Sequence, residues 1–283
     1  MAENLDAPLV ERQPLTGAYV LLTFRHRHIA HTARAGQFVM IKASTVTEPL
    51  LRRPFSIMTV DPLHDTFSLF LKAVGPGSRG LADLRPGEVA PCLGPLGQPF
   101  PDPPAGHDAV LVAGGYGIAP FYLFTQQRLR AGALPHVFYG GRTVADLQLL
   151  EQFGRLGVSL KTATDDGSAG HHGRVTEPLE QHLARSPERQ TVYASGPDPM
   201  LHAVAHVAER RGVTAHVSLD PWMGCGVGTC LGCVVWIQGA QDAAPHRRCA
   251  CTEGPVFEAS EVVWRGETVS LARRAVAGRS GPA

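Results

Sequence analysis

Five of the six cysteines of this 283-residue chain lie in one short stretch, from Cys225 to Cys251. Cys225, Cys230 and Cys233 have the C-x4-C-x2-C spacing with which thiolates hold a [2Fe–2S] cluster. Both irons need tetrahedral sulfur ligation, and a short loop can supply three thiolates only if the residues between them are small. Glycine permits this because it adopts backbone conformations closed to other residues. The loop contains Gly226, Gly228 and Gly232. The spacing predicts an iron–sulfur site and transfer of single electrons.

The fourth thiolate must come from the downstream pair Cys249 and Cys251. In an extended segment these two side chains share a face, so the residues leave both open as the fourth ligand. The alternative is disulfide bonding, which requires an oxidising compartment. The first residues, Met1–Asp6, carry neither the basic nor the apolar region of a secretory signal. We therefore expect metal ligation and a cytoplasmic protein.

A second candidate site precedes the cysteines by more than a hundred residues. The string Arg53–Ser56 is followed by a predicted strand that ends at Phe70–Lys72, and then by a glycine-rich turn with Gly77 and Ser78. Such a turn presents unpaired backbone N–H groups and the positive end of a helix dipole to phosphate. Arg53 and these amides could hold a pyrophosphate, while Phe55 stacks on a ring and Ser56 donates a hydrogen bond. An exposed arginine at a strand edge is the plainer alternative.

A third candidate site is the glycine-rich turn between a predicted strand, Val110–Ala113, and a predicted helix that begins at Ala119. Gly114, Gly115 and Gly117 form the turn. Pro120 fits the first helical turn, where its missing N–H group costs nothing. This is the strand–glycine–helix context of a dinucleotide site, without the full G-x-G-x-x-G fingerprint. Ligands of open α/β sheets bind beyond the carboxyl ends of the strands, so other strand-end turns should line the same crevice. They are Tyr139–Arg142, Thr164–Gly167 and Ser195–Met200.

The elements that position these residues fall into two patterns. Before about Pro103, short alternating runs separated by turn residues predict a small antiparallel Greek-key β-barrel. The predicted strands are Tyr19–Phe24, Gln37–Ile41, Phe55–Val60, Thr66–Ala73 and Glu88–Leu93. The proline-rich segment Pro99–Gly106 marks a domain boundary.

After this boundary, strands alternate with helices, which predicts a parallel-sheet nucleotide-binding domain of the α/β class. The predicted strands are Val110–Ala113, His136–Gly140, Val158–Thr164, Thr191–Ser195 and Thr214–Leu219. The predicted helices are Ala119–Arg130, Val144–Phe153, Glu177–Ala184 and Pro199–Arg211. We therefore expect the barrel over residues 1–103, the α/β domain over 104–221, a small [2Fe–2S] domain over 222–272 and a flexible tail over 273–283.

Charge and composition exclude some classes of partner. Lysine and arginine total 26 and aspartate and glutamate 25, for a net charge of +1, so the chain lacks the basic excess that attracts nucleic acid or an anionic membrane. The stretch Ala109–Gln127 carries no charge and is long enough to suggest a membrane span. Its glycines and Pro120 interrupt it, so we expect a buried strand, a turn and a helix instead. We expect neither nucleic acid nor a membrane as a partner.

The order of these motifs resembles that of the ferredoxin–NADP reductase-like flavoproteins. The resemblance rests on Arg53–Ser56, the Gly77–Ser78 turn, Gly115–Pro120 and Ser195–Met200. With the cysteine spacing and the segment Cys251–Phe257 added, the chain is similar to the electron-transfer subunit of NAD-dependent (class 1B) dihydroorotate dehydrogenase. The similarity extends from about residue 10 to Trp264.

The resemblance implies three cofactors: FAD, a [2Fe–2S] cluster and NAD(H) as co-substrate. For FAD it implies Arg53, Pro54, Phe55, Ser56, Phe70, Leu71, Lys72, Gly77 and Ser78. For NAD(H) it implies Gly115, Gly117, Pro120, Gly196 and Pro197. For the cluster it implies Cys225, Cys230, Cys233 and Cys251. Phe55, Ser78 and Ser195 depart from the tyrosine, threonine and cysteine of many relatives, which affects one flavin contact and the packing of the nicotinamide.

The resemblance also implies an oxidoreductase subunit without an acid or base catalyst of its own. Electrons would come from dihydroorotate through an FMN-containing catalytic subunit, pass the cluster and FAD, and reduce NAD⁺ in pyrimidine biosynthesis. The partner would assemble with this chain as a heterotetramer with two copies of each.

Three alternatives remain open. A similar subunit serves other complexes, of the sulfhydrogenase or ferredoxin-dependent transhydrogenase type. A redox sensor would use the same cofactors without turnover. Arg142, at the end of the second parallel strand, could meet the 2′-phosphate of NADP.

Overall fold

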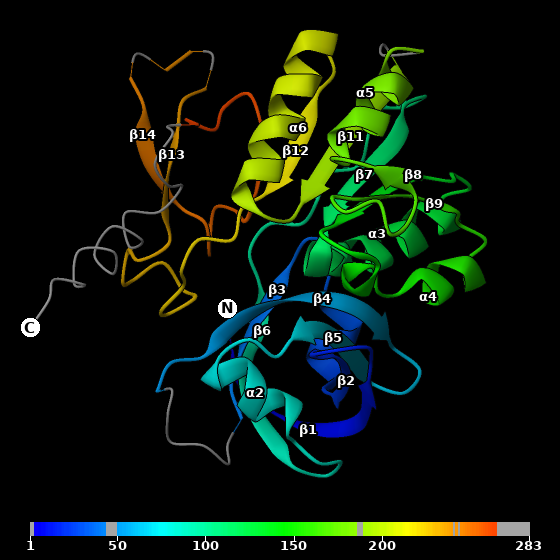
Figure 1. The fold of residues 1–283 in the computed structure, drawn as a ribbon. Helices are drawn as coiled ribbons and strands as arrows, with labels where there is room; N and C mark the ends of the chain where they lie inside the picture. The colour runs from blue at the N-terminus through cyan, green and yellow to red at the C-terminus, as the bar shows by residue number, and fades with distance from the viewer. Residues whose placement is uncertain (1–2, 44–49, 186–188, 240, 243, 265–283) are drawn as a thin grey trace, which may run out of the picture.

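The N-terminal part of the molecule is a closed antiparallel barrel, the lower body in Figure 1. The computed structural model describes residues 3–43, 50–185, 189–239, 241–242 and 244–264, so the predicted tail 273–283 lies outside the described residues. The strands follow the order β1-β2-β5-β4-β3-β6 around the barrel. They are β1 Glu3–Pro14, β2 Tyr19–Arg25, β3 Phe38–Ile41, β4 Arg53–Asp61, β5 Thr66–Lys72 and β6 Val89–Leu96. Two short helices, α1 Arg27–Thr32 and α2 Pro76–Ala82, accompany them. The predicted barrel is confirmed, and it contains one further strand, β1, which the alternation of apolar and polar residues did not predict.

The second body is a seven-stranded sheet in the order β10-β9-β8-β7-β11-β12-β15. All neighbours pair in parallel except β12 and β15. The strands are β7 Asp108–Gly114, β8 His136–Gly141, β9 Leu160–Thr164, β10 His171–His172, β11 Gln190–Ser195, β12 Ala215–Ser218 and β15 Val256–Glu258. The helices are η1 Gly115–Ile118, α3 Ala119–Arg130, η2 Val144–Asp146, α4 Leu150–Arg155, α5 Thr176–Leu183 and α6 Asp198–Arg211.

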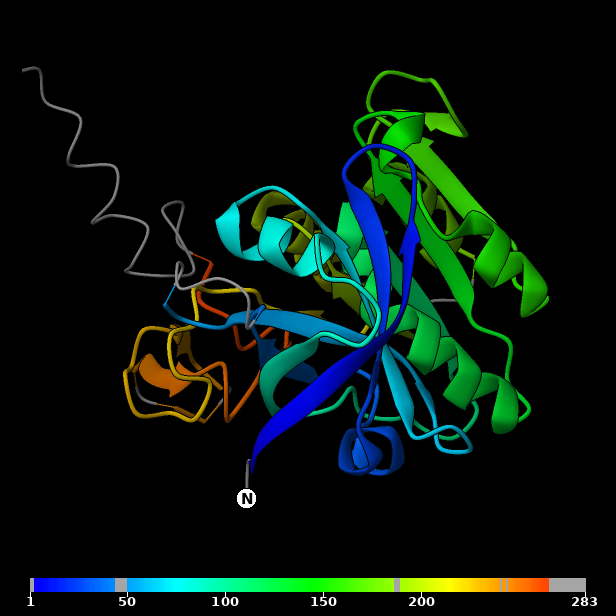
Figure 2. The same cartoon turned by 90° about the horizontal axis from the view of Figure 1, so that it is seen from below.

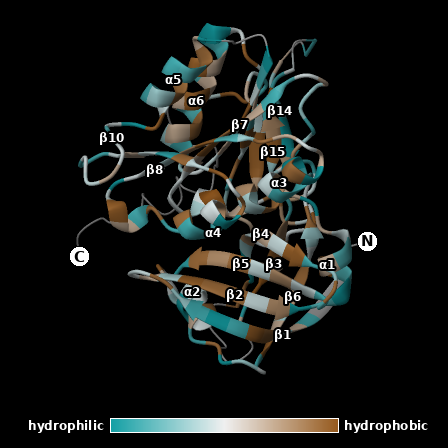
Figure 3. Ribbon diagram, turned by 90° about the vertical axis from the view of Figure 1, so that its right-hand side faces the viewer, coloured by the Kyte–Doolittle hydropathy of each residue, from teal (hydrophilic) through white to brown (hydrophobic). Residues whose placement is uncertain are grey.

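Helices cover both faces of this sheet, as a parallel sheet requires. Along β7, Leu111 and Ala113 point to one face, where they share a core with Phe121 of α3 and Phe153 of α4. The alternate residues of β7 share a core with α5 and α6 on the other face. Figure 3 shows the hydrophobic residues concentrated on these central strands and alternating along the barrel strands. None of the helices in the described part of the chain is long and apolar enough to cross a membrane.

An aromatic cluster joins the barrel to the sheet. Phe100, just after β6, stacks on Phe121 with ring centroids 5.4 Å apart and meets the edge of Tyr193 at 5.7 Å. The Tyr193 hydroxyl donates a hydrogen bond to the carbonyl oxygen of Pro101. The predicted proline-rich boundary is therefore a packed connection between the two bodies.

The C-terminal segment lies beside both bodies, at the left of Figure 1, and also flanks the barrel in the view of Figure 2. It contains a two-stranded hairpin, β13 Val234–Ile237 with β14 His246–Cys249. It then returns to the α/β body, where β15 pairs with β12 at the edge of the sheet. The predicted cluster region is thus attached to the nucleotide-binding sheet by its own last strand.

One predicted element is wrong. The predicted helix Val144–Phe153 is divided into η2 and α4, with Leu149 between them in the left-handed region at φ +63°. The reason lies outside the segment: the hydroxyl of Tyr139 accepts a hydrogen bond from the Gln148 N–H group and donates one to the Asp146 carbonyl oxygen. These two backbone groups are therefore bonded to a side chain of β8 rather than to the next helical turn.

Candidate functional site

The four cysteines predicted as cluster ligands lie in two pairs on the C-terminal segment. The Cys230 thiol donates a hydrogen bond to the sulfur of Cys225, and the Cys251 thiol donates one to the sulfur of Cys233. Within the described residues, no three His, Cys, Asp or Glu side chains converge as ligands of a single metal ion. Pairs of thiols match a two-iron cluster, in which four thiolates are shared between two irons. The structure brings together all four predicted cysteines.

Backbone amides of the cluster loop (residues 224–233) point at these sulfur atoms. The N–H groups of Val227 and Cys230 donate to the sulfur of Cys225, each with 3.4 Å between nitrogen and sulfur. The N–H group of Gly228 donates to the sulfur of Cys251 over 3.2 Å, across to the downstream strand region. Such contacts favour thiolate, the form that ligates iron, and hydrogen bonds to cluster sulfurs tune the reduction potential.

The pKa values follow from these contacts. Partial burial raises the pKa of the Cys225 thiol, but hydrogen bonds from the loop amides and from the Cys230 side chain together outweigh it and bring the pKa to about 7. The hydrogen bond from Cys251 lowers the pKa of Cys233 to about 6, and the same bond raises the pKa of Cys251. These contacts therefore lower the pKa of one cysteine in each pair toward the thiolate form that ligates iron.

The pairs differ in burial, which places the site at the surface. Cys233 and Cys251 are buried, whereas Cys225 is half-buried and Cys230 is exposed. The extra thiol, Cys249, is half-buried and also donates to the sulfur of Cys233. Burial raises its pKa, and among the described contacts no amide of the cluster loop reaches its sulfur. A cluster held here would have one side in the protein and the other within reach of a second protein.

The cluster loop packs directly on the barrel. Gly226 has φ +77°, and a Cβ atom there would lie 2.6 Å from Cγ of Met40 in β3 and 3.1 Å from Cδ1 of Leu96 in β6. Only glycine allows this approach. Met40 and Leu96 belong to the same core as Cys233 and Cys251. The contact therefore fixes the cysteines against the barrel strands next to the predicted FAD motif, because β3 pairs with the Arg53–Ser56 part of β4.

The predicted FAD residues lie on adjacent strands at one end of the barrel. Arg53 begins β4, and its Nη1 donates to the carbonyl oxygens of Leu51 and Arg52 at 3.0 and 3.2 Å. Among the described residues no carboxylate pairs with it. Pro54, Phe55 and Ser56 are half-buried on the same strand.

The helix start at Gly77 and Ser78 has the predicted form, but its hydroxyl is occupied. Oγ of Ser78 accepts from the N–H groups of Val74 and Gly75, both at 3.0 Å, and donates to the Gly75 carbonyl oxygen. The first hydrogen bond within the helix is donated by the Arg79 N–H group to the Gly75 carbonyl oxygen. The N–H groups of Gly77 and Ser78 come before it, in the first turn, where helix N–H groups have no intrahelical acceptor. The phosphate contacts left to this turn are therefore backbone N–H groups rather than the serine hydroxyl.

The three residues at the end of β5 are placed differently from one another. The side chains of Phe70 and Leu71 are buried in the barrel, and Phe70 stacks on Tyr19. These two could meet FAD only through their backbone. Lys72 is half-buried and pairs with Asp146 of η2 through its Nζ, at 2.9 Å from Oδ1. Its charge is therefore already matched by a carboxylate of the α/β body.

The predicted dinucleotide glycines meet at the point where the sheet order reverses. β7 has β8 on one side and β11 on the other, and ligands of such sheets bind outside this switch point. A Cβ atom on Gly117 would overlap the carbonyl group of Ser195 and lie 2.8 Å from Cα of Gly196. One on Gly196, at φ +155°, would lie 2.9 Å from the nitrogen of Gly114. The two turns can touch only because they are made of glycine.

Pro197 and Pro120 complete this region. Pro197 immediately precedes α6, and Pro120 lies in the first turn of α3, as predicted. Gly115 has φ +54° and open space beside its Cα, so its backbone is accessible to a ligand. The turns after β8 and β9 are joined by a hydrogen bond from the Val144 N–H group to Oγ of Ser168. The structure thus gathers all the predicted strand-end turns along one edge.

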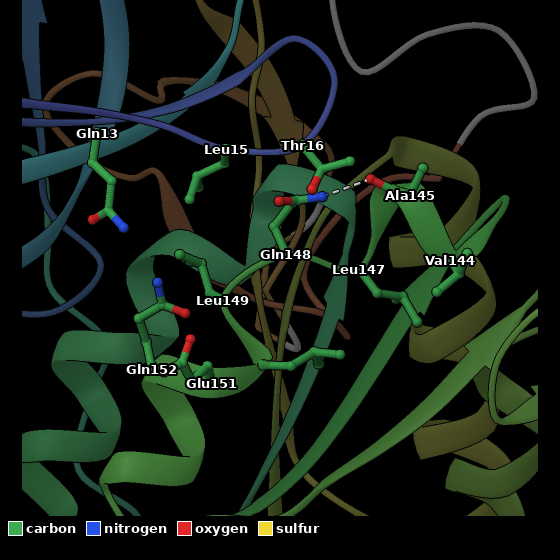
Figure 4. Close-up of a pocket in the computed structure, with 11 residues that line it drawn as sticks. Gln13, Leu15, Thr16, Val144, Ala145, Leu147, Gln148, Leu149, Glu151 and Gln152 are labelled. Carbon is green, nitrogen blue, oxygen red and sulfur yellow. Dashed lines mark hydrogen bonds between the residues drawn. The ribbon is translucent and has the colours of Figure 1, made fainter.

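A cavity of about 410 Å³ lies elsewhere, between the β1–β2 turn and the η2–α4 segment. Figure 4 shows Gln13, Leu15 and Thr16 on one side and the residues after Val144 on the other, with Gln148 bonded to the Ala145 carbonyl oxygen. None of the predicted site residues lines it. The cavity lies between the two bodies, and its lining includes Ala145 and Leu147, the neighbours of Asp146. The contact between Asp146 and Lys72 could not be predicted from the sequence, because these two residues are far apart in the chain.

Two family models match the chain over the regions just described. Residues 220–263 match the iron–sulfur cluster binding domain of dihydroorotate dehydrogenase B. Residues 111–206 match an oxidoreductase NAD-binding domain. The first contains all four paired cysteines, and the second contains the glycine turns at the switch point.

Solved structures share the fold. One from work on flavin-based electron bifurcation, an NADH-dependent reduced ferredoxin–NADP oxidoreductase, is 28% identical with a TM-score of 0.81, covering 96% of this chain and 94% of its own. A ferredoxin–NADP⁺ reductase from Neisseria gonorrhoeae with bound FAD and NADP is 19% identical with a TM-score of 0.63, covering 74% and 92%. The second likeness concerns the fold alone.

Sequence relatives cover nearly the whole chain. The dihydroorotate dehydrogenase B (NAD⁺) electron transfer subunit of Bacillus caldolyticus is 40% identical over 86% of this chain and 91% of its own length. That of Desulforamulus reducens is 33% identical over 93% of this chain and its own full length. With its barrel, its switch-point glycines and its paired cysteines in the same order, the chain belongs to the family of electron-transfer subunits of NAD⁺-dependent dihydroorotate dehydrogenase B.

Proposed function

We propose that this chain carries electrons from an FMN-containing, dihydroorotate-oxidising subunit to NAD⁺ in pyrimidine biosynthesis, as half of a cytoplasmic heterotetramer with two copies of each chain. The observation that carries the proposal is the position of the paired cysteines. They lie at the surface on one side and against barrel strands β3 and β6 on the other. A flavin exchanges electrons singly or as hydride, so it suits the position between an iron–sulfur cluster and a nicotinamide.

Each part of the chain has a separate task in this proposal. Cys225, Cys230, Cys233 and Cys251 hold the [2Fe–2S] cluster, and the loop amides stabilise their thiolates. Arg53 and the α2 amides hold the FAD pyrophosphate, while Phe55 and Ser56 contact the ring system. Gly115, Gly117 and Gly196 bring the backbone close to NAD(H). We retain residues 1–103, 104–221 and 222–272 as the domains, with β15 returning from the last to the sheet of the second.

The exposed side of the cluster loop is the proposed contact with the catalytic subunit. Val227 and Leu231 are 43% and 62% exposed, and Thr229 is exposed between them. Trp222, just before the loop, is 52% exposed. Leu231 also has φ +56°, a left-handed conformation that an L side chain rarely adopts. An apolar residue kept exposed and strained beside a ligand cysteine supports a docking role for the loop.

Co-expression with the catalytic subunit tests the proposal. The complex should reduce NAD⁺ when dihydroorotate is supplied, and its mass should match two copies of each chain. The isolated chain should oxidise NADH with ferricyanide as acceptor but show no activity with dihydroorotate. A complex that reduces NAD⁺ no faster than the catalytic subunit alone would refute the proposal.

The structural likeness to a ferredoxin–NADP oxidoreductase favours one second candidate. In that case the chain would exchange electrons with another flavoprotein subunit and with ferredoxin rather than with a dihydroorotate-oxidising subunit. The 40% identity to a dihydroorotate dehydrogenase subunit, against 28% for this structure, supports the first proposal. The same chain mixed with reduced ferredoxin and NAD⁺ would show rapid NADH formation only in the second case.

A further inference from the structure

One carboxylate ties the nucleotide-binding body to the barrel. Oδ1 of Asp146 accepts hydrogen bonds from the Tyr19 hydroxyl of β2 and from Nζ of Lys72 of β5, each at 2.9 Å. The carboxylate is only 14% exposed, and Lys72 also lies over the Tyr19 ring, 4.7 Å from its centroid. Tyr19 and Lys72 are cross-strand partners in the barrel, so both donors come from one rigid position.

The neighbours of Asp146 hold it in place from the other side. The Tyr139 hydroxyl of β8 donates to the Asp146 carbonyl oxygen at 2.9 Å, and the Asp146 N–H group donates to the Thr143 carbonyl oxygen. A Cβ atom on Gly141 would lie 2.9 Å from Cβ of Asp146, so the turn after β8 can take this shape only with glycine. The carboxylate is therefore fixed to the carboxyl end of β8, which borders the dinucleotide crevice.

Arg142, in the same turn, approaches the same carboxylate from the exposed side. Its Nε lies 3.8 Å from Oδ2 of Asp146, and its side chain is 80% exposed. This contact is long for an ion pair and leaves the guanidinium free to turn toward an anionic ligand. The Asp146 carboxylate thus makes short hydrogen bonds to the barrel and only a long contact to the exposed Arg142.

We propose that Asp146 is a positioning residue for hydride exchange, and that Lys72 and Tyr19 act through it rather than on the flavin phosphates. By fixing the β8–η2 turn to the barrel, the carboxylate sets where the dinucleotide lies relative to a flavin held on β4. Arg142 then remains the mobile member of the group and meets a phosphate of the dinucleotide. The inference rests on the proposed exchange of hydride between NAD(H) and FAD.

The chemistry requires this precision. Hydride transfer needs the two reacting atoms about 3–3.5 Å apart, and a misplacement of about 1 Å can cost on the order of a hundredfold in rate. The dinucleotide and the flavin are held by different bodies, so the contact between those bodies determines the distance. Near the crevice, the Tyr19–Lys72–Asp146 group is a partly buried polar contact between them, whereas the aromatic cluster around Phe100 lies at the connection after β6.

The test compares Asp146→Asn and Lys72→Met with Asp102→Asn. The control removes an exposed carboxylate, 3.2 Å from Nη1 of Arg128, that also joins the linker to α3. Flavin reduction by saturating NADH is followed by stopped-flow absorbance, together with the long-wavelength charge-transfer band of the nicotinamide–flavin complex. FAD content and the midpoint of thermal unfolding are measured on the same samples.

Both variants should retain FAD and cluster, lose about tenfold in the rate of flavin reduction and show a weaker charge-transfer band. The double variant should be no slower than the slower single variant, because the two residues act as one unit. The control should match the wild type. If Asp146→Asn does not fold, Tyr19→Phe removes one hydroxyl from the group and should lower the rate about threefold by the same geometric effect.

Two results would overturn the inference. A lower unfolding midpoint with an unchanged rate and charge-transfer band would mean that Asp146 only stabilises the fold. Loss of FAD in Lys72→Met but not in Asp146→Asn would make Lys72 a phosphate ligand. A wild-type chain whose flavin is not reduced by NADH would instead refute the proposed function, which separates the two failures.

Discussion

A single residue separates Cys249 from Cys251, yet the cluster loop contacts them differently. The Gly228 amide donates to the sulfur of Cys251, which is buried and bonded to Cys233. Cys249 is half-buried, and its own N–H group is bonded to Oε2 of Glu253. We expect Cys251→Ser to lose the cluster and Cys249→Ser to keep iron and sulfide near wild-type content. Visible absorbance and iron and sulfide analysis check this, and the reverse pattern would assign Cys249 as the ligand.

Arg53 is the second residue whose role can be tested directly. Its guanidinium is bonded to two backbone carbonyl groups, and we expect it to turn to the FAD pyrophosphate when FAD binds. Loss of a hydrogen bond to a charged group costs about 1.5–3 kcal/mol, or roughly 10- to 100-fold in affinity. Arg53→Ala should therefore be purified with little FAD but a full cluster. Arg85→Ala, an exposed arginine after α2, is the control, and full FAD retention by Arg53→Ala would contradict the assignment.

At the scale of elements, α5 contains a titratable group that should make stability depend on pH. Burial first, and then the nearby His136, Lys161 and Arg185, lower the pKa of His182 to about 4 against the opposing effect of Asp108. Its Nε2 is buried and has no hydrogen-bond partner among the described residues, and the centroid of its ring lies 4.5 Å from that of His136. The helix is thus packed on β8 through a histidine that is neutral in the folded state.

The sign of the effect follows from linkage. Because the pKa is lower in the folded state than its ordinary value of 6.5, the unfolded state binds more protons below that pH. The stabilisation is therefore complete above about pH 6.5 and is lost as the pH falls toward 4. His182→Gln should flatten the fall of the thermal unfolding midpoint between pH 7 and 5. His206→Gln, on the exposed side of α6, is the control, and an unchanged slope in His182→Gln would refute the assignment.

The elements also show where sequence patterns succeed. The helix Ala119–Arg130 was predicted with its exact bounds, because the glycine turn and Pro120 define its start and the strand before it is uniformly apolar. The single helix predicted over Val144–Phe153 does not form. The Tyr139 hydroxyl is bonded to two backbone groups of this segment, and Tyr19 and Lys72 of the barrel are bonded to the Asp146 carboxylate. Strand β1 was missed because charged residues and Pro8 interrupt its alternation, although it pairs with both β2 and β6.

At the scale of the whole molecule, the cysteine spacing and the glycine turns are local and could be read from the sequence. The contacts that bring the sites together are not local. Gly226 packs against Met40, and Asp146 pairs with Lys72, although the two residues of each contact lie far apart in the sequence. No pattern within a segment encodes such pairs, since each depends on how two separately formed bodies pack. The sequence could therefore predict which cofactors are bound but not how their sites are held relative to one another.

The exposed cluster loop gives the last prediction, which concerns assembly. Leu231 has a strained backbone at φ +56°, and its side chain is 62% exposed. In the isolated chain this leucine therefore adds backbone strain while burying little apolar surface. Leu231→Gly relieves the strain of a non-glycine residue in this region, and the isolated chain should keep its cluster and its unfolding midpoint.

The same variant should bind the catalytic subunit more weakly, because an apolar anchor is lost from the contact. Val227→Asp should go further and abolish dihydroorotate-dependent NAD⁺ reduction by placing a charge in the interface. NADH oxidation by ferricyanide should persist in both, since the FAD and dinucleotide residues are untouched. Size-exclusion chromatography of the co-expressed chains measures assembly, and the two activities are assayed on the same fractions. If the variants assemble and couple like the wild type, the catalytic subunit docks elsewhere and the exposure of this loop needs another cause.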